Sequence, residues 1–154
     1  MASSLTITAS TVDPGLLALP WSTPLAQWPS SVIVSLPKGL SRHLVRFAVL
    51  SGGVVAVKET TEEMARREYE MLGNLTRLAV PCVDRAAVIA GRSDASGKPL
   101  PAALVTTHLK FSLPYRALFQ QVLRPDTATR LVDALAVLLV RLHKDFFDFS
   151  QAMT

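Results

Sequence analysis

The chain has 154 residues, of which 49% are hydrophobic and 18% charged, so it is predicted to be one domain with a buried core, and a largely disordered chain is excluded. Its net charge of +4 is spread along the sequence without a basic cluster, so the composition does not indicate nucleic-acid binding. A single cysteine, Cys82, excludes a disulfide framework, and because we find neither a secretory signal nor an apolar run long enough to span a membrane, we expect a cytoplasmic protein.

Residues 1–30 differ in composition from the rest of the chain. Five of the ten prolines lie within the first 37 residues, together with many Ser and Thr residues and one charged residue, Asp13. Proline at this density prevents a long helix. We therefore expect residues 1–30 to be an N-terminal extension that packs irregularly or stays loose.

Strand patterns begin after this extension. Residues 32–34, 43–50 and 54–58 are rich in Val, Leu, Ile and Phe, and the Ser-Gly-Gly sequence at 51–53 favours a tight turn that joins the last two as a hairpin. Two further strands are predicted at residues 83–89 and 102–107, with a polar, glycine-bearing loop at 91–101 between them.

A helix is predicted between the hairpin and the later strands. Thr60 followed by Glu63 is typical of a capping box, and Pro81 ends the segment. One face of this helix carries an apolar stripe that contains a carboxylate: Met64, Glu68, Met71, Leu72, Leu75 and Leu78.

The C-terminal part also favours helices. Residues 115–123 predict a short helix, and residues 129–143 predict a strong helix that is apolar on most of its circumference. Asp126 or Thr127 can cap this second helix. Residues 144–154 show no clear period.

Lys58 and Glu68 are the residues at which the sequence predicts a site. Because strand side chains alternate between faces, Lys58 shares a face with Ala56. Glu68 lies near the centre of the apolar stripe, where a carboxylate is costly unless a cation meets it, so we expect it to pair with Lys58. The alternatives are a lysine that reaches water at the sheet margin, and a glutamate at the edge of the stripe that meets water or another base.

These residues occur in motifs that resemble the N-terminal lobe of the protein-kinase-like superfamily. VAVKE at 55–59, then a capped helix with REYEML at 67–72, then a Val-Pro step at 80–81, is similar to small bacterial branches such as aminoglycoside phosphotransferases and lipopolysaccharide (Kdo/heptose) kinases. The stretches 36–47, 104–119 and 131–143 resemble an uncharacterised bacterial kinase-like family whose members are often labelled lipopolysaccharide kinases.

The resemblance implies an α+β fold. Residues 31–112 would form a kinase-like N-lobe, with about five antiparallel strands and one helix of the αC type. Residues 113–154 would form a partial helical C-lobe with a divergent tail.

The resemblance also implies that the cofactor is ATP. Lys58 would grip the phosphates, Glu68 would hold the lysine in place, and Ala56 would leave room for the base. Gly39 would lie in the loop that covers the phosphates, although residues 36–41 contain this one glycine rather than GxGxxG. The segment Thr107, His108 and Leu109, with Thr106 before it, would hold the adenine by backbone groups.

The end of the sequence departs from the family. In the family, the helix that ends in Arg-Leu-His is followed by a Trp-Gly-Asp segment, whose Asp is the catalytic base. A metal-binding Asn comes shortly after that segment. Residues 144–151 contain neither, and we interpret Asp145 and Asp148 as ordinary acidic residues. We therefore expect no catalytic residue, no Mg²⁺ site and no phosphotransferase turnover in this chain.

Three interpretations follow from the sequence. The chain is an ATP-dependent phosphotransferase of kinase type, a non-catalytic nucleotide-binding or interaction module (a truncated, pseudokinase-like product), or a small α+β domain that binds a partner. Because the rest of a C-lobe is missing, we expect the helix at residues 129–143 to expose apolar surface and to favour self-association or a protein partner. His43, His108 and His143 show no ligand spacing, so no metal site is expected.

Overall fold

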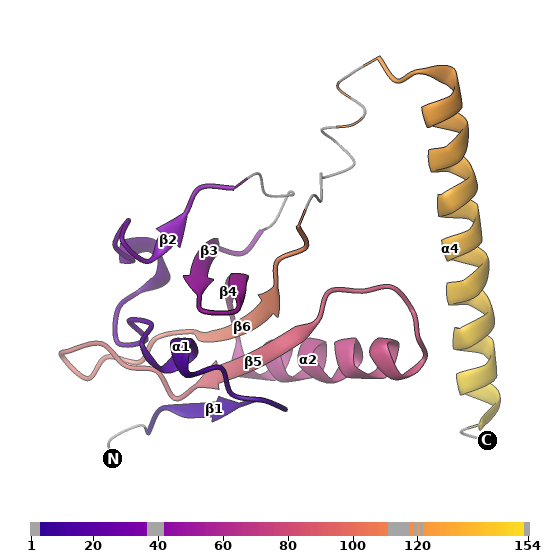
Figure 1. Cartoon of the computed structure of the whole chain (residues 1–154). Coiled ribbons are helices and arrows are strands. Elements are labelled where there is room, and N and C mark those ends of the chain that lie inside the picture. Colours follow the sequence, from indigo (N-terminus) through magenta and orange to yellow (C-terminus); the bar gives the residue numbers. More distant parts are fainter. Residues whose placement is uncertain (1–3, 37–41, 111–117, 119, 121, 153–154) are drawn as a thin grey trace.

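The computed structural model describes residues 4–36, 42–110, 118, 120 and 122–152, with side chains up to residue 144 in the last stretch. The fold is α+β. Six strands form one sheet in the order β1-β5-β6-β4-β3-β2, with all neighbouring strands antiparallel (Figure 1). The strands are β1 (Thr6–Thr8), β2 (Ile33–Val34), β3 (Val45–Leu50), β4 (Gly53–Thr60), β5 (Arg85–Ala90) and β6 (Ala102–Thr107).

Three helices and one 3₁₀ turn accompany the sheet in the described part of the chain: α1 (Pro14–Leu17), η1 (Leu25–Gln27), α2 (Glu62–Arg77) and α4 (Pro125–Ala152). The predicted short helix at 115–123 falls mostly outside the described residues. No helix in the described ranges combines the length and the apolar character that a membrane span requires.

The predicted hairpin joins β3 to β4, and β4 is one of the two central strands of the sheet. β3 and β4 pair from Val45 opposite Lys58 to Leu50 opposite Gly53, and Gly53 adopts a φ of 136°, which a residue with a Cβ rarely adopts. The other edge of β4 pairs with β6, so β4 is an interior strand. Its backbone is therefore held on both sides along its length.

Alternation of side chains gives the sheet two different apolar faces. One face packs against α2 through Ala65, Tyr69, Val88, Ala102 and Leu104. The other face packs against the N-terminal segment, which supplies buried residues to the larger core: Leu16, Leu19, Trp21, Leu25 and Trp28. β4 contributes to the larger core through Val55 and Val57, and it turns Ala56 and Lys58 to the α2 side.

The described part of the N-terminal segment packs against the sheet, which is one of the two alternatives expected from the sequence. The described residues 4–30 add a sixth strand, β1, which pairs with β5, and they cover one whole face of the sheet. Proline does prevent a long helix there, but the Leu and Trp residues between the prolines are apolar enough to pack against the strands. Proline density by itself does not predict the strand β1 or the size of this contribution to the core.

α2 begins one residue later than the capping pattern suggested. Thr60 is buried at the end of β4, and the N-cap is Thr61, whose hydroxyl accepts a hydrogen bond from the Met64 N–H. The buried face also differs from the predicted stripe: it consists of Ala65, Tyr69 and Gly73, whereas Met64 and Met71 are exposed. Ala65 and Gly73 are small enough to let the helix lie close to the sheet, and Tyr69 packs between them.

α4 is longer than predicted. It spans Pro125–Ala152, so the helix continues through the residues that lacked a clear period. In Figure 1 it stands apart from the sheet. Several of its large apolar side chains are exposed, among them Val132, Val137, Leu139 and Val140, as expected for a helix that is apolar on most sides.

Candidate functional site

Lys58 and Glu68 form the ion pair that the sequence predicted. Lys58 lies on the interior strand β4, opposite Val45 on one side and Leu104 on the other. Its ammonium Nζ donates to Glu68 Oε2 on α2. The Lys58 side chain is 23% exposed and the Glu68 side chain 38%, so the pair sits at the margin between helix and sheet, within reach of solvent.

Glu68 occupies the edge of the buried face of α2 rather than its centre. Its neighbour Tyr69 is buried against the sheet, and Glu68 is only half-buried. Glu68 thus pairs with Lys58, as predicted, and at the same time lies at the edge of the stripe, where it reaches water. Both the lysine ammonium and water are therefore within reach of the carboxylate.

Arg85 on β5 holds α2 in this position. Its guanidinium lies 4.4 Å from the centre of the Tyr69 ring, and Nη1 donates to the Tyr69 carbonyl oxygen at 3.2 Å. The guanidinium also lies against Gly73, where a Cβ would overlap it. The sequence analysis missed this residue, because an arginine at the start of a strand carries no local signal of such a contact.

A row of three side chains lies beside the ion pair on the same face of the sheet, with Ala56 and Thr106 half-buried and Phe47 buried. Ala56 is opposite Phe47 on β3 and Thr106 on β6, so these three residues form a row across three strands. None of the three belongs to the core under α2. The Phe47 and His108 rings meet edge to face with centroids 5.1 Å apart, which closes one end of the row with aromatic surface.

The backbone N–H groups at the end of β6 and just after it donate hydrogen bonds to other parts of the protein. The Thr107 N–H donates to the Asp84 carbonyl and the His108 N–H to the Val54 carbonyl, each at 2.9 Å. Neither N–H is therefore available to a ligand unless a bond of the fold is broken. The Leu109 side chain is 48% exposed, and Gly39, the predicted loop glycine, lies outside the described residues.

A second ion pair, which the sequence analysis did not identify, lies on the opposite face of the sheet. Arg92 is fully buried and donates to Glu59 Oε1 at 2.9 Å and to the carbonyl oxygens of Trp21, Thr23 and Pro101 at 2.9–3.1 Å. Since Glu59 follows Lys58 on β4, the two neighbours point to opposite faces. Glu59 Oε1 also accepts from the Leu25 N–H at 3.0 Å, so this pair joins the N-terminal segment to the sheet.

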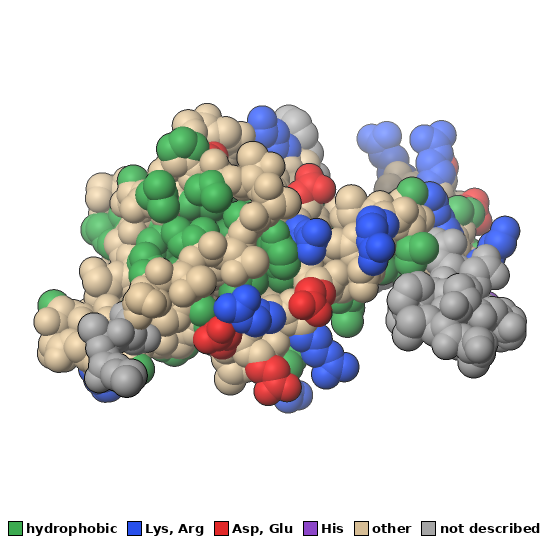
Figure 2. All heavy atoms as spheres, turned by 90° about the horizontal axis from the view of Figure 1, so that it is seen from below, with side chains coloured by type: hydrophobic (Ala, Val, Ile, Leu, Met, Phe, Trp, Pro, Cys, Tyr) green, Lys and Arg blue, Asp and Glu red, His purple; other side chains and the backbone are tan. Residues whose placement is uncertain are grey.

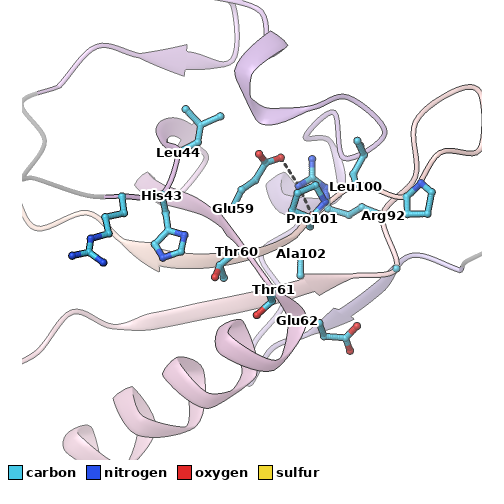
Figure 3. A pocket seen from close by; sticks show the side chains of 13 residues that line it. His43, Leu44, Glu59, Thr60, Thr61, Glu62, Arg92, Leu100, Pro101 and Ala102 are labelled. Atoms are coloured by element: carbon cyan, nitrogen blue, oxygen red, sulfur yellow. Dashed lines mark hydrogen bonds and ion pairs between the residues drawn. The ribbon is translucent and has the colours of Figure 1, made fainter.

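A pocket of about 700 Å³ lies at the end of β4 and does not include Lys58 or Glu68. Figure 3 shows Glu59 and Arg92 pointing toward each other there, with His43 on the opposite side from Leu100. Because the bonds described above engage the Arg92 guanidinium, it cannot receive an anion without releasing the N-terminal segment. The lining residues are Arg42, His43, Leu44, Glu59, Thr60, Thr61, Glu62, Gly91, Arg92, Pro99, Leu100, Pro101 and Ala102.

The described residues contain no group of three or more His, Cys, Asp or Glu side chains arranged to hold a metal ion. The Lys58–Glu68 arrangement places a lysine ammonium on the same face of the sheet as the half-buried Ala56 and Thr106. A lysine ammonium is a group that can form charge-assisted hydrogen bonds with an anionic oxygen.

Comparison with known proteins gives no assignment by similarity. No protein-family model matches the chain, and no curated protein or solved structure matches it either.

Proposed function

We propose that this chain is a kinase-like nucleotide-binding domain in which Lys58, held by Glu68, contacts the phosphates of ATP. The observation that carries the proposal is the ion pair between an interior strand and the helix that follows it. In protein kinases the lysine that binds the phosphates lies on the third strand, and its glutamate partner lies on the αC helix. Counted from β2, Lys58 lies on the third strand, β4, and Glu68 lies on α2, the next element.

The surface beside the pair supports the same assignment. A nucleotide whose phosphates meet Lys58 would extend its base along Ala56 toward Phe47 and Thr106, which share that face of the sheet. The small side chain of Ala56 leaves room for a flat ring. His108 would lie at the far end of the base, where its ring already contacts Phe47.

The proposal is limited to binding. Phosphoryl transfer requires metal ions that neutralise charge and a base that accepts the proton of the acceptor hydroxyl. The proposal rests on the sequence here, because residues 144–151 lack the Trp-Gly-Asp segment and the asparagine that serve these roles in the family it resembles. The chain would thus bind nucleotide without turnover, as a pseudokinase-like module related to phosphotransferases of the lipopolysaccharide-kinase type.

Calorimetric titration with ATP tests the proposal. We expect wild-type chain to bind ATP, and Lys58→Met to weaken binding by about tenfold or more, because a charge-assisted hydrogen bond contributes roughly 1.5–3 kcal/mol. Lys98→Met is the matched control, since Lys98 is an exposed loop lysine on another part of the surface. A wild-type chain that does not bind ATP, or a Lys58→Met chain that binds it equally well, would overturn the proposal.

A second candidate function, binding of a protein partner or self-association, is favoured by the exposed apolar side chains of α4. It is compatible with nucleotide binding, because the two functions use different elements. Turnover of ATP that is lost in Lys58→Met would instead favour an active phosphotransferase.

A further inference from the structure

A pocket of about 300 Å³ lies at the edge of the sheet where the pairing of β2 with β3 ends. We call it the edge pocket. Most of its wall is apolar: Ile33, Val34, Leu36, Val45 and Phe47. Its polar lining consists of Ser30, Ser35 and Arg46. The volume is at the lower end of the range of pockets that hold small organic molecules.

Arg46 lines the edge pocket with a guanidinium that has no partner. The residue is half-buried, and its Nε is buried without a hydrogen-bond partner. Within the described ranges, no carboxylate or carbonyl oxygen bonds to its two Nη groups either. Removing part of a cation from water without giving it a partner is unfavourable. The Nη groups are not buried, so an anion in the pocket can reach them and offset this cost.

The sequence around Arg46 supplies no acidic residue to neutralise it. No Asp or Glu occurs between Asp13 and Glu59. Asp13 caps α1, and Glu59 binds Arg92. The surface of α2 differs: on the face of the molecule seen in Figure 2, acidic and basic side chains are mixed where α2 lies. The charge of Arg46 is therefore left for a group from outside the chain.

Arg92 shows what a structural arginine looks like in the same fold. It is fully buried, and it donates to one carboxylate and to three carbonyl oxygens. Arg46 makes none of these bonds, although its Nε is shielded from water as well. A buried polar atom without a partner in a native fold calls for an explanation beyond stability, and a missing ligand is one such explanation.

The edge pocket is separate from the surface proposed for ATP. Arg46 is opposite Val57, which belongs to the larger core, whereas Val45 is opposite Lys58. Because side chains alternate along a strand, Arg46 and Lys58 point to opposite faces of the sheet. A phosphate held by Lys58 would therefore not meet the guanidinium of Arg46. A ligand in the edge pocket would occupy a second site.

The lining of the edge pocket indicates the chemical class of the ligand. Among the described lining residues Arg46 is the one that carries a charge, so a group with a single negative charge matches it, and its planar guanidinium suits a planar carboxylate. The hydroxyls of Ser30 and Ser35 are further donors, and the apolar wall suits an apolar body. We propose that the edge pocket binds a small organic monocarboxylate, with its carboxylate at the Nη groups of Arg46.

Titration with hexanoate, followed by the amide NMR signals of the whole chain, tests the proposal. We expect hexanoate to shift the signals of Ser35 and Arg46 to saturation, and hexan-1-ol to leave them in place. Arg46→Met should weaken hexanoate binding by about tenfold or more, because a charge-assisted bond is lost. Arg67→Met is the matched control, since Arg67 is an exposed arginine on α2. No saturable shift in the wild-type chain, equal effects of the two substitutions, or tighter binding of inorganic phosphate than of hexanoate would overturn the proposal.

Thermal unfolding without ligand separates a binding role of Arg46 from a structural one. We expect Arg46→Met to leave the midpoint of unfolding unchanged or to raise it, because the substitution removes a buried polar atom that has no partner. A fall as large as that caused by Arg92→Met would assign Arg46 a structural role and overturn the proposal. Because neither measurement involves nucleotide, their outcome is independent of the ATP proposal.

Discussion

At the scale of single residues, the alternation of side chains along β4 decides which face of the sheet Lys58 points to. Its neighbours Val57 and Glu59 face the N-terminal segment, and Lys58 faces α2. A shift of one residue in the pairing of β4 would exchange the roles of Lys58 and Glu59. The register of the hairpin is therefore what gives each of the two charged neighbours its partner.

The strength of the Lys58–Glu68 pair is measurable by a double-mutant cycle with Lys58→Ala and Glu68→Ala. We expect a coupling free energy of about 0.5–1 kcal/mol in urea unfolding, because both side chains are partly exposed and water screens the attraction. The coupling should decrease in about 1 M salt. Additive effects of the two substitutions would mean that the two residues do not interact.

Asp94 gives a pH-dependent prediction in the loop between β5 and β6. The Ser96 hydroxyl, followed by the Lys98 backbone N–H, lowers the pKa of Asp94 below its ordinary value of 3.8. These bonds therefore stabilise the turn above that value and are lost as the pH falls through the lower pKa of the folded state. We expect amide exchange at Ser96 and Lys98 to accelerate with acidification beyond its intrinsic pH dependence, and no such transition in Asp94→Asn. An identical profile in Asp94→Asn would contradict this account.

At the scale of elements, periodicity predicted where strands and helices lie, but not which helix face is buried. In α2 the inward face consists of Ala65, Tyr69 and Gly73, because the helix approaches close to the sheet. In α4 the same periodicity predicted a helix and an apolar surface, and both are observed. The position of a buried face depends on the shape of what it meets, which a hydrophobic pattern does not contain.

Gly73 and Arg85 test the packing of α2 against the sheet. We expect Gly73→Ala to destabilise the protein by about 1 kcal/mol, because the new Cβ displaces the Arg85 guanidinium from Tyr69 and the loss exceeds the gain in helix propensity. In an Arg85→Ala background the same substitution should stabilise by about 0.5–1 kcal/mol, since the propensity gain remains. Thermal unfolding of wild type, the two single variants and the double variant measures these changes in stability. If Gly73→Ala destabilised the protein in both backgrounds, the role of Arg85 would be contradicted.

At the scale of the whole molecule, the sheet depends on the N-terminal segment. Leu16, Trp21, Leu25 and Trp28 cover the face opposite α2, and the Trp21 and Trp28 rings meet edge to face at 5.2 Å. Arg92 connects this segment to Glu59 and to the loop before β6. The candidate site and the N-terminal segment thus lie on opposite faces of the same strands.

Arg92→Met should destabilise the molecule by about 3–5 kcal/mol, because it leaves Glu59 and buried carbonyl groups without their partner. Tryptophan fluorescence reports on Trp21 and Trp28, and circular dichroism reports on the sheet and helices. We expect both transitions in urea to shift to a lower concentration. Lys98→Met is the exposed control and should leave them unchanged, and a shift of comparable size in the control would contradict the assignment.

Local patterns in the sequence predicted the hairpin, the strand with Lys58, the helix with Glu68 and the pairing of the two. These features depend on residues that are close together in the chain: the turn at 51–53 sets the hairpin, and the helix follows β4 almost at once. Short separations leave few arrangements, so side-chain periodicity is sufficient to identify the partners.

The role of residues 4–30, the position of β1 and the buried Arg92 were decided by tertiary structure alone. Arg92 meets the carbonyl oxygens of Trp21 and Thr23 about 70 residues earlier, and the Ser10 N–H donates to the Tyr69 hydroxyl across 59 positions. Backbone carbonyl groups are present at every residue, so no side-chain pattern indicates which of them a buried arginine will bind. Only the folded chain, which brings one face of the sheet against the N-terminal segment, selects these contacts.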